Sequence, residues 1–215
     1  MKKKIGIFDI DGTLVDAYDA ITRNFNYALK SLGYPSVSIE QVKKAVGGGS
    51  KLLAAKFVRP EHIEEFLKIY NNNHTRFLKG RVRLMKGSEE LLKFLTDRGL
   101  LLGVATNRSR SSVPPVLEEL KIDKYFDIIC TADDVANPKP DPSMILYIMD
   151  TLKAKKEESF YIGDMVIDFL TGKNAGVDTY ILATGSSPRD ELEEIKGINL
   201  FDNLCSLKDY LNTVI

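Results

Sequence analysis

Residues 5–13 read IGIFDIDGT, and this stretch decides the fold and directs the search for a function. Its apolar first half is typical of a buried strand, and two aspartates, Asp9 and Asp11, follow with only Ile10 between them. Two like charges this close repel each other, so a fold that keeps both near its interior needs a cation or a chemical role for them. The rest of the sequence must supply one or the other.

Short apolar runs of this kind recur along the chain and alternate with segments of helical periodicity. Five runs stand out, at residues 5–10, 101–107, 126–132, 159–164 and 178–185. The alternation predicts an α/β fold in which a doubly wound parallel sheet is connected by helical crossovers. In such a sheet, ligands collect at the carboxyl ends of the strands, next to the point where the strand order reverses.

The segment at residues 16–82 breaks this alternation because it contains helical patterns and no convincing strand. One apolar stripe lies along a first predicted helix, which ends at Gly33. A second stripe lies along a predicted helix that begins after Pro60. The stripes consist of Ile21, Phe25, Ala28, Leu29 and Leu32, and of Ile63, Phe66, Leu67, Tyr70, His74 and Phe77. We therefore expect an all-helical domain at residues 16–82, inserted into a core formed by residues 1–15 and 83–215.

Composition and charge exclude several classes of protein. Hydrophobic residues make up 44% of the 215 residues and charged residues 28%, the balance of a soluble globular protein. Lys plus Arg and Asp plus Glu both total 30, so no basic field argues for a nucleic-acid or membrane partner. The apolar runs are far shorter than the roughly 20 residues that cross a bilayer. The two cysteines, Cys130 and Cys205, lie far apart in the sequence, which fits a reduced cytoplasmic setting. We expect a cytoplasmic protein, either a monomer or a homodimer.

Polar side chains gather at the carboxyl ends of the predicted strands and in the segments that follow them. In chain order they are Asp9, Asp11, Thr106, Asn107, Lys139, Asp164 and Asp168. If they converge, four carboxylates meet one lysine and one threonine hydroxyl, and that set needs a divalent cation. Oxygen ligands without histidine or cysteine describe Mg²⁺. One aspartate of the first pair can then be a nucleophile and the other a proton carrier.

Four motifs built on these residues carry a resemblance to a known family. They are DIDGT at residues 9–13, VATN at 104–107, NPKPDP at 137–142 and GDMVID at 163–168. By these motifs and their order, the chain resembles the haloacid dehalogenase-like hydrolase superfamily, specifically its phosphatase and phosphomutase branch with a helical cap after the first strand. The resemblance covers essentially the whole chain, and four motifs in order make a chance match negligible.

The resemblance implies a role for each aspartate. Asp9 would attack phosphorus to form an aspartyl-phosphate, and Asp11 would protonate the leaving oxygen and later take a proton from the attacking water. Mg²⁺ would be bound by the carboxylates of Asp9 and Asp164 and by the backbone carbonyl of Asp11, whose side chain stays free. Asp168 would orient Lys139 or a metal-bound water.

The other motif residues would bind the phosphoryl group or shape the first loop. The resemblance implies that Thr106 and Lys139 hold the phosphoryl oxygens. Asn107 would either add a further donor or cap the next helix. Gly12 would allow the backbone to turn tightly, and Thr13 would help to hold the loop.

A glycine-rich segment in the expected cap, VGGGSKLLAAK at residues 46–56, is a candidate contact with substrate. Its glycines precede a helical stretch whose free amides could meet an anion, and a loop of this kind contacts the leaving group in capped members of the family. Gly48 and Lys51 are therefore candidate substrate-binding residues, with a flexible turn and a solvated lysine as the alternative. His62 and His74 are expected to be ordinary helix residues.

These features favour a Mg²⁺-dependent phosphatase that acts on a small phosphorylated metabolite, of the phosphoglycolate phosphatase or pyrophosphatase kind. A hinged cap would exclude bulk water during the first transfer and would favour small substrates. A sugar-phosphate mutase of the β-phosphoglucomutase type is the nearest alternative, because it would use the same Asp9 and Asp11. A phospho-receiver signalling module is a remote one, because the motif at residues 163–168 has no role there.

Overall fold

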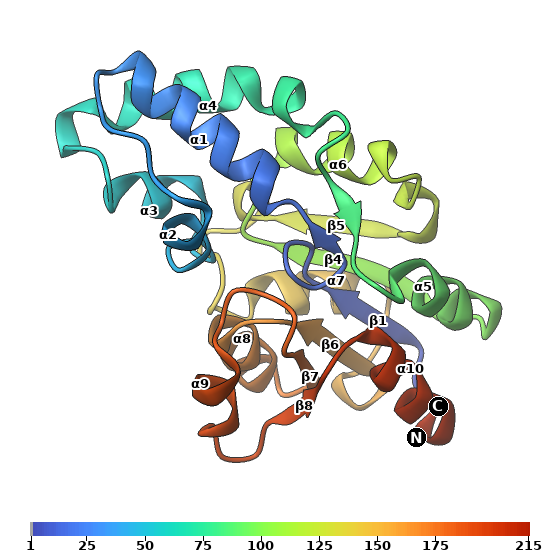
Figure 1. Ribbon diagram of the computed structural model, residues 1–215. Coiled ribbons are helices and arrows are strands. Elements are labelled where there is room, and N and C mark those ends of the chain that lie inside the picture. Colours follow the sequence, from blue (N-terminus) through green and yellow to red (C-terminus); the bar gives the residue numbers. More distant parts are fainter. Residues whose placement is uncertain (1) are drawn as a thin grey trace.

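The computed structural model describes residues 2–215 and is built around a six-stranded sheet (Figure 1). Across the sheet the strands are β5 (Ile128–Thr131), β4 (Leu101–Thr106), β1 (Ile5–Phe8), β6 (Ser159–Gly163), β7 (Asp178–Leu182) and β8 (Asn199–Phe201). Each neighbouring pair is parallel. The chain moves outward from β1 to β5, returns to the other side of β1 and moves outward again, so the predicted doubly wound sheet is confirmed.

The five runs predicted to be strands form β1, β4, β5, β6 and β7. The sixth strand, β8, was not predicted. It has only three residues at the edge of the sheet, with Asn199 exposed and the next two residues half-buried. Three residues are too few to show the alternation of apolar and polar side chains by which a strand is recognised.

Helices cover both faces of the sheet, and side chains alternate between those faces along each strand. Ile5 and Ile7 belong to one buried cluster, together with residues of α7 (Ser143–Thr151). Phe8 belongs to another, together with residues of α5 (Ser88–Asp97) and α10 (Leu204–Val214). The remaining helices of the core are α6 (Val113–Glu119), α8 (Val166–Ala175) and α9 (Arg189–Glu193).

The inserted segment is helical, as predicted, and it sits over one end of the sheet (Figure 1). Its helices are α1 (Tyr18–Ser31), α2 (Ile39–Lys43), α3 (Gly49–Ala55) and α4 (Ile63–Leu78). Phe25 of α1 forms the centre of its core, with its ring 4.8 Å from that of Phe66 and 5.5 Å from that of Phe57. The two apolar stripes identified in the sequence thus face each other, and we refer to residues 16–82 as the cap.

A short antiparallel ribbon joins the cap to the core. Its strands are β2 (Val15–Asp16) and β3 (Arg83–Leu84), which carry the chain into and out of the cap side by side. The expected boundary between residues 15 and 16 lies within β2, and the one between residues 82 and 83 directly precedes β3. The two-residue strands themselves gave no signal in the sequence. Short 3₁₀ turns lie at Pro60–His62, Arg110–Ser112, Asp123–Tyr125, Ala132–Asp134 and Lys156–Glu158. Within residues 2–215, no helix combines the length and apolarity needed to span a membrane.

Candidate active site

Asp9 and Asp11 lie in the loop that follows β1, at the carboxyl end of the sheet. The amide of Asp9 donates a hydrogen bond to the carbonyl oxygen of Ile162 in β6 (2.9 Å), so the sheet still fixes its position. Asp9 is only 6% exposed, whereas Asp11 is half-buried. One carboxylate of the pair is therefore enclosed by the core, and the other lies nearer to the cap.

Gly12 and Thr13 shape this loop around Asp164. Gly12 has a φ of +82°, and a Cβ atom there would lie 2.5 Å from both Asp164 Oδ2 and Tyr18 Oη. Only glycine combines that backbone conformation with so close an approach. Thr13 Oγ1 donates to Asp164 Oδ1 (2.9 Å), and the amide of Ser186 donates to Asp164 Oδ2 (2.9 Å). Both oxygens of Asp164 are thereby oriented from outside the first loop as well as from within it.

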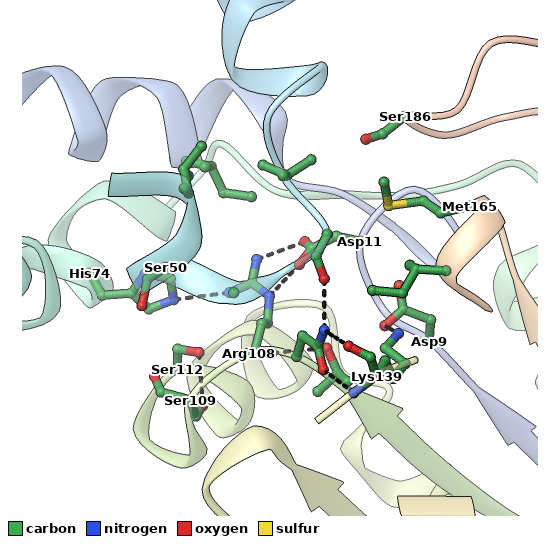
Figure 2. Close-up of a pocket in the computed structure, with 18 of the residues that line it drawn as sticks. Asp9, Asp11, Ser50, His74, Arg108, Ser109, Ser112, Lys139, Met165 and Ser186 are labelled. Atoms are coloured by element: carbon green, nitrogen blue, oxygen red, sulfur yellow. Dashed lines mark hydrogen bonds and ion pairs between the residues drawn. The ribbon is translucent and has the colours of Figure 1, made fainter. Parts of the chain in front are cut away.

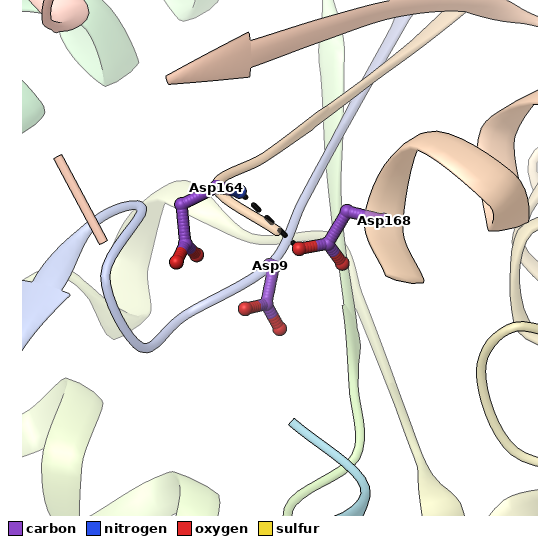
Figure 3. A group of neighbouring side chains, drawn as sticks. All are labelled: Asp9, Asp164 and Asp168. Atoms are coloured by element: carbon purple, nitrogen blue, oxygen red, sulfur yellow. Dashed lines mark hydrogen bonds between the residues drawn. The ribbon is translucent and has the colours of Figure 1, made fainter. Parts of the chain in front are cut away.

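Asp9, Asp164 and Asp168 form a buried carboxylate cluster (Figure 3). Each contributes an oxygen that lies within 4.8 Å of the oxygens of the other two. Asp164 directly follows β6 and Asp168 lies in the first turn of α8. The four-residue spacing brings both carboxylates back to the end of the same strand, next to Asp9.

The carboxylate of Asp168 is occupied by donors of the protein itself. Its Oδ1 accepts hydrogen bonds from Lys139 Nζ and Tyr161 Oη, both at 2.7 Å. Its Oδ2 accepts from the backbone amides of Asp164 (3.2 Å) and Met165 (3.1 Å). Tyr161 was not identified from the sequence, since an aromatic residue inside a strand reads as core. With four donors already in place, Asp168 acts as an anchor for the groups around it.

Lys139 is the ammonium group of this cluster and is 5% exposed. Besides Asp168, it donates to Asp9 Oδ1 (2.8 Å) and to Tyr161 Oη (3.1 Å). Burial by itself lowers the pKa of Lys139, but the charges of Asp168 and Asp9 raise it above its ordinary value, so the side chain stays charged. Asp9 Oδ2 accepts no hydrogen bond from any residue in the range 2–215, which leaves that oxygen available.

The cluster carries more negative than positive charge. Burial raises the pKa of Asp9 to about 6, against the opposing effect of Lys139. Burial and the charge of Asp168 raise the pKa of Asp164 well above its ordinary value. Three carboxylates face one ammonium group, so a divalent cation would balance the charge. Carboxylate and carbonyl oxygens are ligands that suit Mg²⁺, and the residues present fit such an ion.

Thr106 and Asn107 follow β4, as predicted, but they are engaged differently. Thr106 is 2% exposed, and its Oγ1 accepts only a 3.3 Å hydrogen bond from the amide of Arg108. Asn107 Nδ2 donates to the carbonyls of Gly47 (2.7 Å) and Lys139 (3.2 Å), and its Oδ1 accepts from the Lys139 amide (3.0 Å). Both N–H groups of Asn107 are therefore used, and the side chain braces two loops instead of capping the next helix or offering a donor to substrate.

Two residues of the site, Arg108 and His74, were not identified from the sequence. Arg108 Nε and Nη2 donate to Asp11 Oδ2 (2.6 Å) and Oδ1 (2.7 Å), and Nη1 lies 3.1 Å from His74 Nε2 (Figure 2). A bidentate ion pair with Arg108 therefore holds the Asp11 side chain in this structure, a contact that the sequence did not indicate. Burial and the charge of Arg108 lower the pKa of His74 to about 4, so its imidazole is neutral and accepts the bond.

A cavity lies between the cap and the core beside these groups (Figure 2). Its core side is polar and includes Asp9, Asp11, Thr106, Arg108 and Lys139. Its cap side is largely apolar and includes Ile21, Val46, Leu53 and Tyr70. A small molecule placed here would have one end against the carboxylate cluster and the other against the cap.

The glycine-rich segment of the cap reaches this cavity through other residues than those expected. The members that line it are Gly47, Gly49 and Ser50. Gly48 and Lys51 do not line it, and Lys51 is exposed. Helix α3 turns Leu53 inward, and the helical period then carries Lys51 to the outer side. In this structure Gly47, Gly49 and Ser50 therefore line the cavity, whereas the expected residues Gly48 and Lys51 do not.

An acidic cluster with a buried lysine, at the carboxyl edge of a doubly wound sheet and beneath a helical cap, is the arrangement of a capped hydrolase with a Rossmann-like core. The family model for the haloacid dehalogenase-like hydrolases matches residues 6–182, and the chain belongs to that family. It is an enzyme of the phosphatase type, as the resemblance implied.

Individual relatives agree with this assignment. The chain is 29% identical over 217 residues to phosphoglycolate phosphatase 1 of Pseudomonas aeruginosa, covering 95% of this chain and 78% of the relative. It is 32% identical over 176 residues to the pyrophosphatase PpaX of Halalkalibacterium halodurans, covering 82% and 81%. A haloacid dehalogenase-like family hydrolase from Streptococcus pneumoniae shares the fold, with a TM-score of 0.86 at 22% identity over 97% of this chain and 98% of that one.

Proposed function

We propose that this protein is a Mg²⁺-dependent phosphatase that hydrolyses a small phosphate monoester through a phosphorylated Asp9. One observation supports the proposal above the others. Asp9 is buried between Lys139 and two further carboxylates, and it also lines the cavity between cap and core. A carboxylate with an available oxygen at the wall of a cavity is suited to nucleophilic attack.

The carboxylates of Asp9 and Asp164, with the backbone carbonyl of Asp11, are the groups that would hold the metal. Asp168 is a poorer ligand because four donors of the protein already occupy it. When bound, Mg²⁺ supplies positive charge for the carboxylates and for the phosphoryl oxygens. Thr13 and the Ser186 amide keep the Asp164 carboxylate in one orientation for this role.

In the first transfer, an oxygen of Asp9 forms a bond to phosphorus while the bond from phosphorus to the ester oxygen breaks. Asp11, protonated once its ion pair with Arg108 has opened, gives its proton to the departing oxygen. Lys139 and Thr106 hold the phosphoryl oxygens, which carry the negative charge in the transition state. Thr106 suits this task because its hydroxyl proton is donated to no residue in the described range 2–215.

In the second transfer, water replaces the leaving group in the cavity. Asp11, now a carboxylate, takes a proton from that water as its oxygen bonds to phosphorus, and the bond to Asp9 breaks. Phosphate leaves and both aspartates return to their starting states. Asp11 donates a proton in the first transfer and accepts one in the second. The ion pair between Asp11 and Arg108 must therefore open or rearrange during the cycle.

The lining of the cavity, polar toward the core and largely apolar toward the cap, supports a small substrate. Relatives of this chain are a phosphoglycolate phosphatase and a pyrophosphatase, both of which are named for small phosphorylated compounds. We therefore propose a small phosphorylated metabolite as the substrate. A phosphate group on a protein surface would not fit beneath a cap that covers the cavity.

Phosphate release from a panel of small phosphate esters and pyrophosphate tests this function. The assay is run with Mg²⁺ and with a chelator, and Asp9→Asn protein serves as the blank. Release that requires the metal and is absent from the blank supports the proposal. No release from any ester, together with interconversion of sugar phosphates, would identify a mutase instead.

A further inference from the structure

Arg108 is a buried cation on the side of the cavity that faces the cap. Its side chain is 8% exposed. Of the described residues that line the cavity, the charged cations are Arg108 and Lys139, because His74 is neutral. Lys139 lies at the core end, paired with Asp9 and Asp168, where the proposed function uses it for the transferred phosphoryl group. Arg108 is therefore the positive charge nearest to the place where the leaving group of an ester would lie.

The hydrogen bonds of Arg108 are incomplete. A guanidinium group has five N–H donors. Two of them bind Asp11 and one binds His74, so two find no acceptor within residues 2–215. Leaving N–H donors of a buried cation unpaired is costly, and an oxygen-bearing anion is the partner that guanidinium groups prefer. The N–H donors of Arg108 that face Asp11 are thus paired, and two further N–H donors are available to a molecule in the cavity.

The surroundings of Arg108 suit an anionic group of small size. Hydroxyl and amide side chains line the same cavity, namely Asn71, Ser50, Ser109 and Ser112. Asp9 and Asp11 are the carboxylates among the described lining residues, and both belong to the catalytic end. No further acid in that lining would repel an anion from the cap side, and the apolar walls formed by Ile21 and Leu53 limit its size.

We propose that Arg108, held from the cap by His74, selects phosphate esters whose leaving group carries a second anionic group. This inference rests on the proposed function, which puts the phosphoryl group at Asp9 and the leaving group toward the cap. An ester with a neutral leaving group leaves two donors of Arg108 unpaired, whereas a carboxylate or phosphate accepts from them. Because Arg108 also holds Asp11, the residue that recognises the leaving group is the one that orients the proton carrier.

Two esters of matched size test the proposal. 2-Phosphoglycolate and 2-hydroxyethyl phosphate have the same chain length and differ in a carboxylate against a hydroxymethyl group. We expect the wild-type enzyme to prefer phosphoglycolate by about 10- to 100-fold in kcat/KM, the range for a charge-assisted hydrogen bond. In Arg108→Gln this preference falls to less than about threefold, while Arg108→Lys, which keeps the charge, retains part of it.

Two further variants separate recognition from general damage. Arg110→Gln removes an exposed arginine of the same loop that does not line the cavity, and its preference stays at the wild-type value. His74→Phe keeps an aromatic ring but removes the acceptor, and it raises KM for phosphoglycolate more than for 2-hydroxyethyl phosphate. Thermal unfolding followed by circular dichroism identifies any variant that has failed to fold. If Arg108→Gln does not fold, the substrate preference of Arg108→Lys is compared with that of the wild type instead.

Binding to the inactive Asp9→Asn protein gives a readout that does not depend on turnover. In calorimetry we expect phosphoglycolate to bind at least about tenfold more tightly than 2-hydroxyethyl phosphate, and Arg108→Gln to remove the difference. An equal loss on both esters, or a wild-type preference for the neutral one, overturns the proposal. The wild type could release phosphate from neither ester while Arg108→Gln still loses the binding preference for phosphoglycolate. That result would refute the proposed phosphatase activity and support the proposed role of Arg108 in binding.

Discussion

The two ends of the cavity differ in how their charges are satisfied. At the core end, Lys139 and Asp168 bind each other and their neighbours through several hydrogen bonds, all between groups of the sheet and its loops. At the cap end, Arg108 links a core loop to His74 of the cap and retains unpaired donors. The comparison teaches that the charges of the core end are satisfied within the core, whereas those of the cap end depend on how cap and core meet, where we propose that the substrate is selected.

The largest expected effect breaks the core end. Asp9→Asn removes the nucleophile but keeps the shape of the side chain, so kcat should fall by at least about 10³-fold, to the rate of phosphate release without enzyme. Phosphate release under saturating substrate measures this. Asp123→Asn, at an exposed position, is the matched control and should turn over normally. Wild-type turnover by Asp9→Asn would mean that another group attacks phosphorus.

The next effect concerns stability at the core end. Lys139→Met leaves three buried carboxylates without their ammonium partner, and we expect the free energy of unfolding to fall by about 3 to 5 kcal/mol in the absence of metal. Urea denaturation in the presence of a chelator measures it. Lys93→Met, which removes an exposed partner of Asp97, should leave the denaturation midpoint almost unchanged. Equal stability of both variants would show that the cluster does not depend on Lys139.

A smaller effect concerns the cap end and its response to pH. The pKa of His74 is lowered from 6.5 to about 4 on folding, so the unfolded chain binds a proton more readily than the folded protein between these values. Its contribution to stability is present above pH 6.5 and is lost as the pH falls toward 4. Between pH 7.5 and pH 5, the wild type should lose about 2 kcal/mol more than His74→Gln.

Denaturation of both proteins at the two pH values checks this difference, because the carboxylates titrate in both and cancel. If the wild type and His74→Gln showed the same pH dependence, His74 would be solvated, and a neutral imidazole would not be holding Arg108.

The smallest effect sharpens the distinction between the residues near the glycine-rich segment. Lys51 is exposed and does not line the cavity, so Lys51→Ala should change kcat/KM less than about twofold on every accepted ester. Ser50→Ala, one residue earlier, removes a hydroxyl that does line it and serves as the comparison. A change of substrate preference in Lys51→Ala alone would show that the cap turns this lysine inward when substrate binds.

The sequence predicted the sheet and the catalytic end of the site for a local reason. Asp9, Thr106 and Asp164 each follow an apolar run directly, and the ends of parallel strands meet wherever the chain goes between them. Asp168 needed only the helical period from Asp164. Lys139 was predicted from the motif at residues 137–142, which contains it. None of these placements depends on how the cap is oriented.

The cap end could not be predicted in the same way. His74 lies on an apolar stripe, and the sequence does not say that this part of α4 meets Arg108 of the core. Arg108 directly follows Thr106 and Asn107, and a cation next to that motif is a signal in the sequence for a residue of the site. Lys51 was misplaced because the start of α3 at Gly49 decides which side chains of the segment face inward.

The central claim is that Asp9 becomes phosphorylated. The most direct measurement is to mix the enzyme with a substrate and Mg²⁺, quench with acid, reduce with borohydride, and sequence the peptides by mass spectrometry. An acyl phosphate on aspartate is reduced to homoserine, so the account predicts homoserine at position 9 and unmodified aspartate at position 11 of the same peptide. Turnover with no modification at Asp9, or with the modification at another aspartate, would contradict the account.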